Sequence, residues 1–251
     1  MKRLLICVAL LGACAQESAE IDAGAPAELA PVSLPVADQA GNRMEALTQN
    51  GARWCTADNA WCVETDESGA RAVNGAATVA LGEPADVWPN IIRNADGSVV
   101  VGLIRTQSQM YSGGGGEGSE LLLHSVVDGA AADAGALPYH GSLMIRACFD
   151  EASQRARREA CQDQYDFATR ISLNEAAASG PAQILLETAA STYPGQLNRN
   201  EDSTERSALQ ASDLVIWADP ACSYRRTYIK GADGRYAPNE PLPDCSQYLE
   251  P

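Results

Sequence analysis

Short runs of β-branched and aromatic residues, separated by turns that contain Gly, dominate the pattern of apolar and polar positions along this chain. Three segments place a small polar turn that ends in Gly between two such runs: residues 61–73, 90–105 and 224–237. Gly readily adopts the positive φ that a tight reversal of the chain requires. These segments therefore predict three antiparallel hairpins.

Other segments have the periodicity or the length of single strands. Apolar or β-branched residues occupy every second position from 165 to 173: Tyr165, Phe167, Thr169, Ile171 and Leu173. This period of two is typical of a strand with one buried face. Four further runs have the length of strands: residues 121–127, 143–149, 184–188 and 214–217. We therefore expect an all-β, antiparallel body, either a sandwich or a barrel-like fold.

Two segments interrupt this strand pattern. Residues 150–164 are highly charged and begin with acids, which suit a helix N-terminus. They predict at most one short surface helix, or a linker between two strands. Residues 113–118 (GGGGEG) predict a flexible loop between strands, because they lack the G-K-[ST] ending of a phosphate-binding loop.

The N-terminus has the three-part pattern of a secretory signal peptide. Lys2 and Arg3 form a basic region, and residues 4–11 are an apolar core that is too short to span a bilayer. Residues 11–14 (LGAC) resemble the lipobox of bacterial lipoproteins. The resemblance implies that residues 1–13 are removed, that Cys14 carries a diacylglyceryl group, and that its new amino group is acylated, as by palmitate.

The same region leaves two locations open for the mature protein. Ala15 follows the lipidated cysteine in place of Asp, which resembles cargo of the outer membrane. We therefore expect a lipid anchor in that membrane, with the protein facing the periplasm. Residues 13–15 (ACA) also fit the A-x-A site of ordinary signal peptidase. Cleavage there would release a soluble periplasmic or secreted protein that begins at Gln16.

Composition divides the remaining chain into a tether and a folded body. Residues 14–42 are rich in Ala, Pro and acids and contain no aromatic residue. Such a segment buries too little apolar surface to offset the entropy of ordering, so we expect a disordered tether. Aromatic residues and cysteines continue from there to the C-terminus. This predicts one disulfide-stapled domain over residues 43–251, with two small lobes as the alternative.

Six cysteines remain once Cys7 leaves with the signal and Cys14 is lipidated. An even number in an exported chain predicts disulfides. Grouped by proximity along the chain, they are Cys55 and Cys62, Cys148 and Cys161, and Cys222 and Cys245. We expect this local pairing. A zinc site is disfavoured because no C-x₂-C spacing occurs and the chain has only two histidines.

Charge and hydropathy exclude two classes of function. The chain has 33 acids against 18 bases, a formal net charge of −15. A nucleic-acid partner is not expected, because such binding requires a basic face. No run of 18 apolar residues occurs, so no transmembrane helix is expected either. The membrane is then a partner through the lipid on Cys14 alone.

The residue types that carry chemistry form no catalytic motif. His124 and His140 are too few for an HExxH or a three-histidine metal site. Ser142 is close to His140 in sequence, but a catalytic triad is a spatial arrangement, and no G-x-S-x-G is present. We expect no metal, no cofactor and no catalytic residue. Carboxylate pairs or His140 keep an exported hydrolase as an alternative.

The most distinctive local string is residues 222–228 (CSYRRTY). Arg225 and Arg226 beside Tyr224 are candidate contacts for an anion or a glycan, because the Arg guanidinium offers a planar fork of donors. Alternatively, both arginines pair with acids on a strand. Tyr111 is a further candidate contact.

Residues 54–55, 111–114, 145–148 and 222–226 together resemble uncharacterised exported proteins of Gram-negative bacteria, over most of the chain. This resemblance implies no activity. We therefore expect a lipid-anchored, non-enzymatic envelope protein that binds a glycan, a protein or another envelope component. The alternatives are an exported hydrolase and a structural or assembly subunit of an envelope complex.

Overall fold

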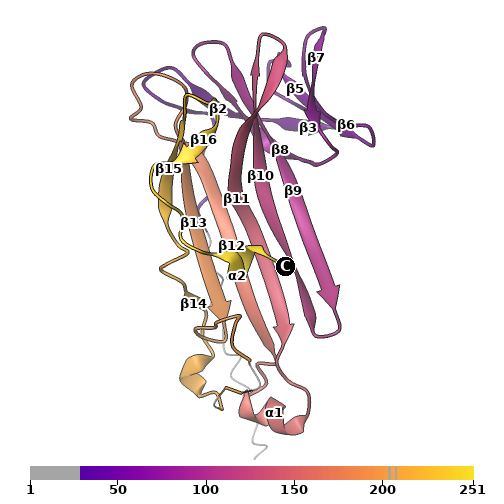
Figure 1. The fold of residues 1–251 in the computed structure, drawn as a ribbon, viewed down its shortest axis with the longest axis vertical. Coiled ribbons are helices and arrows are strands. Elements are labelled where there is room, and N and C mark those ends of the chain that lie inside the picture. Colours follow the sequence, from indigo (N-terminus) through magenta and orange to yellow (C-terminus); the bar gives the residue numbers. More distant parts are fainter. Residues whose placement is uncertain (1–28, 203–204, 207) are drawn as a thin grey trace, which may run out of the picture.

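The computed structural model describes residues 29–202, 205–206 and 208–251. The predicted signal peptide, Cys14 and the first half of the predicted tether lie outside the described residues. The described chain forms two antiparallel β-sheets, and the larger one runs along the length of the molecule (Figure 1). This confirms the all-β prediction.

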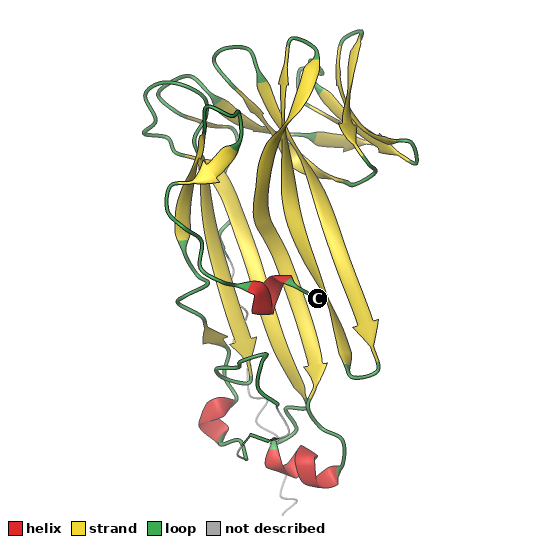
Figure 2. Cartoon of the chain, viewed as in Figure 1, coloured by secondary structure: helices red, strands yellow, loops and turns green. Residues whose placement is uncertain are grey.

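The larger sheet has eleven strands. In spatial order they are β1 (Val36–Ala37), β2 (Arg43–Ala46), β8 (Asp86–Arg93), β9 (Val99–Tyr111), β10 (Gly114–Val127), β11 (Ala130–Arg146), β12 (Gln162–Leu173), β13 (Ile184–Tyr193), β15 (Arg225–Lys230) and β16 (Tyr236–Pro238), with β14 (Trp217–Ala218) paired to β13. The smaller sheet consists of β3 (Thr48–Asn50), β4 (Arg53–Cys55), β5 (Cys62–Asp66), β6 (Gly69–Asn74) and β7 (Ala77–Gly82). The helices are α1 (Glu151–Ala156), α2 (Ser246–Leu249) and the 3₁₀ turn η1 (Ala211–Asp213), all short (Figure 2).

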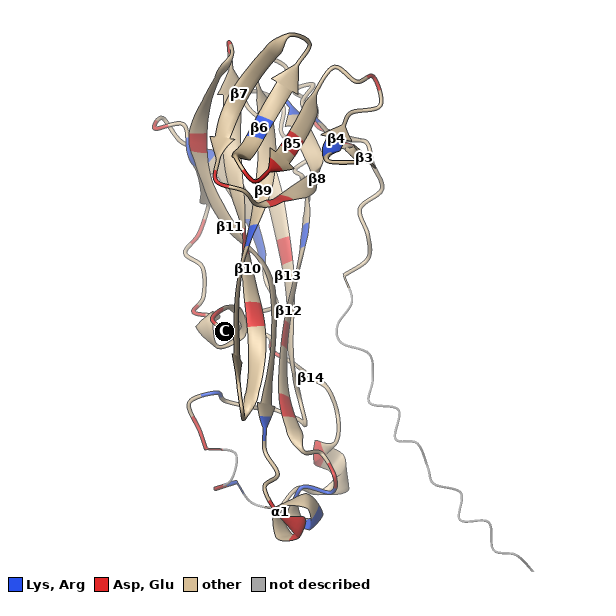
Figure 3. Ribbon diagram, turned by 90° about the vertical axis from the view of Figure 1, so that its right-hand side faces the viewer, with Lys and Arg blue, Asp and Glu red and all other residues tan. Residues whose placement is uncertain are grey.

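At the upper end of the molecule the larger sheet is buried on both faces. The smaller sheet packs across β8 and β9 there (Figure 3). Val99, Val101 and Leu103 of β9 face the smaller sheet, while Val100 between them faces a second core on the other side. A strand buried on both faces is a continuous apolar run rather than an alternating one. This explains the string VVVGLI at residues 99–104.

The second core is enclosed by the coiling of the larger sheet itself. Side chains from β2 to β16 meet in it, among them Met44, Trp88, Leu121, Ile184 and Tyr228. Sheets twist with a fixed hand, so a sheet of this many strands curls until distant strands face one another. The upper half is therefore barrel-like, as predicted, with the smaller sheet laid against its outside.

Below this core, five long strands continue. We call this part the shaft: residues 105–111 of β9, 114–120 of β10, 141–146 of β11, 162–168 of β12 and 189–193 of β13. The short helix α2 lies on one face of the shaft (Figure 1). There Tyr248 packs against Tyr165 and Phe167, with ring centroids 6.2 and 6.4 Å apart. The predicted alternation in β12 is confirmed, because Tyr165, Phe167, Ile171 and Leu173 are buried.

The three predicted hairpins are also confirmed. They correspond to β5–β6, β8–β9 and β15–β16, each paired antiparallel around the predicted turn. Residues 150–164 contain the short exposed helix α1, whose N-cap Asp150 accepts a hydrogen bond from the Ser153 amide. The run at 214–217 forms a strand only from Trp217, and the run at 143–149 only as far as Arg146.

The prediction of a flexible loop at residues 113–118 is wrong. Only Ser112 and Gly113 form a turn, and Gly114 begins strand β10. The glycines are required because neighbouring backbone lies where a side chain would be. A Cβ atom on Gly116 would be 2.7 Å from the carbonyl oxygen of Ser142, and one on Gly118 would be 1.8 Å from that of Leu249.

The prediction that the disordered tether extends to residue 42 is also wrong. β1 lies within that segment and pairs with β2. Asn42 is fully buried, and its side chain donates to Gly180 and accepts from the Ala95 amide. Asp38 in turn accepts from the Asn42 amide and side chain. Contacts with residues far along the chain thus order a segment whose own composition is poor in apolar groups.

All six cysteines of the body form the three predicted local disulfides. Cys55 pairs with Cys62, Cys148 with Cys161, and Cys222 with Cys245. These bonds fit an extracytoplasmic protein, because disulfides persist in oxidising compartments.

Candidate functional site

The shaft has one open edge. β8 pairs with β9 only as far as Ile104, so residues 105–111 have β10 as a neighbour on one side and, within the described chain, no strand on the other. All seven residues are exposed. Figure 1 shows β9 as the outermost strand of the shaft. The backbone N–H and C=O groups along this edge are available to a partner.

The opposite edge of the shaft is closed. β14 pairs with Ser191 and Thr192 of β13, the amide of Asp219 donates to Ala190, and the amide of Gly195 donates to Val215. Natural proteins usually protect a long sheet edge with charged side chains, Pro or a β-bulge. Beyond Arg105 at its start, the open edge has none of these: its sequence is RTQSQMY, and its register against β10 is continuous.

A groove of about 830 Å³ lies beside the open edge, on the face of the shaft that carries α2. Its floor is formed by β9, β10 and β11, and its far wall by the C-terminal segment from Leu242 to Pro251. Gln107 and Gln109 project from β9 at its mouth, and Tyr224 and Pro138 contribute apolar surface. The groove thus combines apolar walls with a few polar groups, as ligand sites commonly do.

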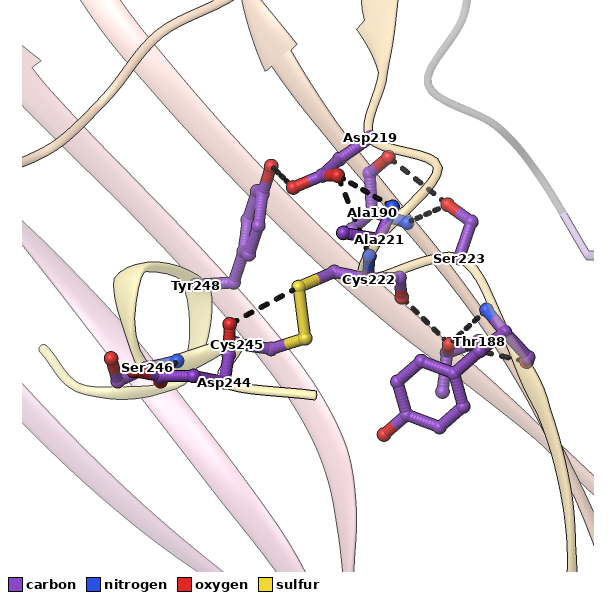
Figure 4. Close-up of a disulfide and its surroundings, with 11 residues drawn as sticks. Thr188, Ala190, Asp219, Ala221, Cys222, Ser223, Asp244, Cys245, Ser246 and Tyr248 are labelled. Atoms are coloured by element: carbon purple, nitrogen blue, oxygen red, sulfur yellow. Dashed lines mark hydrogen bonds between the residues drawn. A yellow bond between two sulfur atoms is a disulfide. The ribbon is translucent and has the colours of Figure 1, made fainter. Parts of the chain in front are cut away.

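The C-terminal wall of the groove is held firmly in place (Figure 4). The disulfide between Cys222 and Cys245 ties it to the segment before β15. The buried Tyr248 hydroxyl donates to Asp219 over 2.9 Å. Burial and the neighbouring Asp219 carboxylate raise the pKa of Tyr248 far above its usual range. The same Asp219 accepts from the amides of Ala221 and Cys222, so one carboxylate joins the two segments.

Glycines let this segment lie directly on the sheet. Gly118 and Gly141 are cross-strand neighbours in β10 and β11. A Cβ on Gly118 would be 1.8 Å from the Leu249 carbonyl oxygen, and one on Gly141 would be 2.0 Å from that of Tyr248. Because these two positions have no side chains, the backbone of α2 can pack directly against β10 and β11. This contact determines how far the C-terminal segment stands from the sheet.

Acidic groups surround the open edge. On the groove side are Glu120 and Glu250. Arg105 forms a salt bridge of 2.5 Å with Glu120, and both side chains are about half exposed. Among the charged residues that line the groove, two are acids and one is a base.

The other face of the shaft carries a polar cluster. Glu117, Ser142 and Asp166 are cross-strand neighbours in one row, and His140 lies in the next row. Ser142 donates to Asp166 over 3.4 Å, and the Nε2 atom of His140 is 3.6 Å from Glu117. Burial raises the pKa of Asp166, while the Ser142 hydrogen bond opposes this shift. Ser142 thus bonds to a carboxylate and not to His140, so these residues do not form a Ser-His-Asp arrangement.

The structure separates the contacts that the sequence suggested. Tyr224 lines the groove, with the Arg226 guanidinium 5.4 Å from the centre of its ring. Arg226 also pairs with Glu240, and Arg225, on the other face of the strand, pairs with Glu187. Pairing with acids on strands was the alternative interpretation of these arginines. Tyr111 lies apart from them, beside the hairpin turn at the far end of the open edge, and is exposed.

His124 lies away from both the groove and the polar cluster. Its Nε2 atom is buried without a hydrogen-bond partner among the described residues, and burial lowers its pKa. It therefore packs as a neutral side chain near Asp133.

Sequence reasoning missed the open edge and the polar cluster. Residues 105–109 are polar on both faces, so they show no alternation that would predict a strand. The turn at Ser112 and Gly113 was the available signal. Glu117 stood inside a run interpreted as a loop, and Asp166 carried no signal beyond its place in an alternating strand.

Comparisons with known proteins add no assignment. No protein-family model matches the chain, and no curated protein or solved structure resembles it significantly. In the described residues, no group of three or more His, Cys, Asp and Glu side chains is arranged to hold a metal ion. None of the described helices is long and apolar enough to cross a membrane.

Proposed function

We propose that this chain is a lipid-anchored protein of the bacterial cell envelope that binds another envelope component. The single observation that carries the binding role is the open edge of β9 with the groove beside it. An unprotected edge is an aggregation hazard unless a partner occupies it. A protein partner therefore explains the edge better than a glycan does, since an edge offers main-chain groups rather than a platform for sugar rings.

Two observations support export and anchoring. The signal pattern ends in the lipobox-like residues 11–14, and the folded body contains three disulfides. The outer membrane, with the body facing the periplasm, is the location we propose. A soluble periplasmic or secreted protein that begins at Gln16 is the alternative.

The anchor is tested by the variant Cys14→Ser. The wild-type chain, produced in a bacterium and labelled with a fatty-acid analogue, should carry the label and partition into detergent. C14S should lose both properties. A wild-type chain that is unlabelled, water-soluble and begins at Gln16 would contradict the anchor and leave the binding role intact.

The binding role is tested by photo-crosslinking in the cells that produce the protein. A photoreactive residue at Gln107, on the open edge, should yield one reproducible adduct with another protein. The same residue at Glu67, in the exposed turn between β5 and β6, is the matched control and should not yield that adduct. No adduct at Gln107, or the same adducts at both positions, would contradict the proposal. A stoichiometric partner would favour the assembly-subunit role.

The polar cluster favours one other function, that of an exported hydrolase. The carboxyl of Asp166 has a raised pKa, and Glu117 lies two strands away in the same row. Two strand spacings amount to about 10 Å, slightly above the separation of the two carboxyl groups in inverting glycosidases. Release of reducing ends from purified cell-wall glycan, abolished by Asp166→Asn, would support this function. Equal release by the variant would exclude Asp166 as the acid.

A further inference from the structure

We propose that the open edge of β9 receives an extended, basic peptide segment of the partner, which pairs antiparallel with it as an added strand. This inference deepens the proposed binding function and rests on it. It specifies which backbone groups make the contact, on which face of the shaft each side chain of the partner lies, and the sign of the partner's charge.

The hairpin turn determines which backbone groups are available. A two-residue turn closes on a hydrogen-bonded pair, here Tyr111 and Gly114. Alternate residues of a strand direct their N–H and C=O groups to opposite sides. The groups of Arg105, Gln107 and Gln109 therefore point to β10. Those of Thr106, Ser108 and Met110 point outward, a spacing that matches the pairing of an added antiparallel strand.

The side chains of an added strand would alternate between the two faces of the shaft. Residues opposite Gln107 would lie at the mouth of the groove, since directly opposed side chains share a face. Residues opposite Ser108 would lie on the face of the polar cluster. On that face Glu117 of β10 is the cross-strand neighbour of Ser108, so it is the nearest side chain beyond Ser108. Peptides that bind by strand addition gain affinity from main-chain bonds and specificity from alternate side chains.

Charge selects a basic partner. The groove side of the edge has the acids Glu120 and Glu250 against the base Arg105, and the other face has Glu117. Glu117 is two strand spacings, about 10 Å, from an added strand, a distance that a long Lys or Arg side chain can largely cover. A second copy of this chain fits poorly, because pairing two β9 edges would bring the same acids together in chains of net charge −15 each.

The test uses amide hydrogen exchange of the mature chain, measured residue by residue by NMR. The probe is a ten-residue peptide of alternating Lys and Val with blocked ends, and the control peptide has Glu in place of Lys. The Lys peptide should slow exchange at the amides of Thr106, Ser108 and Met110. Those of the intervening residues are already bonded to β10 and should change little. The Glu peptide should give no protection.

Two variants separate main-chain pairing from charge. Ser108→Pro removes one outward N–H without touching the bonds to β10 and should abolish protection, while Ser108→Ala should retain it. Glu117→Gln should weaken binding roughly two- to five-fold and reduce its salt dependence. The matched change Glu67→Gln, in the distant turn, should leave binding unchanged.

Several outcomes would overturn the inference. Binding of the Lys peptide without protection of the three outward amides, or equal binding by S108P, would exclude strand addition. Equal binding of the Glu peptide would exclude the charge argument. Protection of these amides that rises with protein concentration, in the absence of peptide, would identify a second copy as the occupant. If Gln107 still crosslinks to a partner in cells in any of these cases, the proposed function stands and only this mode of binding fails.

Discussion

Adding a single methyl group at Gly118 should push the C-terminal segment away from the shaft and loosen its packing. In Gly118→Ala the new Cβ would lie 1.8 Å from the carbonyl oxygen of Leu249, whereas ordinary contacts begin near 3.4 Å. The backbone of α2 must therefore retreat by about 1.6 Å, the difference between these two distances. No side-chain rotation can relieve the collision, because both groups are fixed to the backbone.

The free-energy cost follows from what α2 buries. Tyr248 is 1% exposed and donates its hydroxyl proton to Asp219. A buried aromatic side chain removes about 150–250 Å² from water, which at about 25 cal/mol/Å² gives roughly 4–6 kcal/mol as an upper limit. A retreat of this size loosens the packing without exposing the whole ring. We therefore expect G118A to lower the free energy of unfolding by about 2–4 kcal/mol.

Urea unfolding of the mature chain measures this change, and the accessibility of Tyr248 to solvent identifies its origin. Gly113→Ala is the control, because the nearest atom to its new Cβ is an ordinary 3.5 Å away. It should change stability by less than about 0.5 kcal/mol. Gly141→Ala should resemble G118A, and the double variant should cost less than the sum, since one retreat relieves both collisions. A G118A chain that is as stable as wild type, with Tyr248 still buried, would refute the claim that α2 packs directly on Gly118 and Gly141.

Three further changes test other contacts. Tyr248→Phe removes the hydrogen bond to the buried Asp219 carboxylate and should cost about 1.5–3 kcal/mol in urea unfolding; an unchanged midpoint would contradict this bond. Asp163→Asn breaks the buried ion pair between Asp163, which is 3% exposed, and Arg157, which is 6% exposed. It should lower the free energy of unfolding by about 3–5 kcal/mol. His124 has a folded-state pKa below its unfolded value of 6.5, so the unfolded chain binds the extra proton and stability should fall as pH drops below 6.5. His124→Gln should flatten that part of the stability curve, and an equal slope in both chains would assign it to other groups.

Local features of this fold could be inferred from the chain alone. The β5–β6 turn brings its strands together within a few residues, and the three disulfides join cysteines 7, 13 and 23 positions apart. The alternation from Tyr165 to Leu173 reflects a face on which four of the five alternating residues are buried, with Thr169 half-buried. In each case the cause lies within a short stretch of sequence, so a periodic or spacing pattern records it.

The features that matter for binding depend on contacts between distant residues. Position 118 has no room for a side chain because Leu249, more than a hundred positions later, lies against it, and nothing near Gly118 in sequence signals this. Asn42 is ordered by Gly180 and Ala95. The open edge exists because β8 starts too late to cover the second half of β9. Periodicity records which side of a strand is buried, but it carries no information on where a neighbouring strand begins, and that geometry creates the proposed binding site.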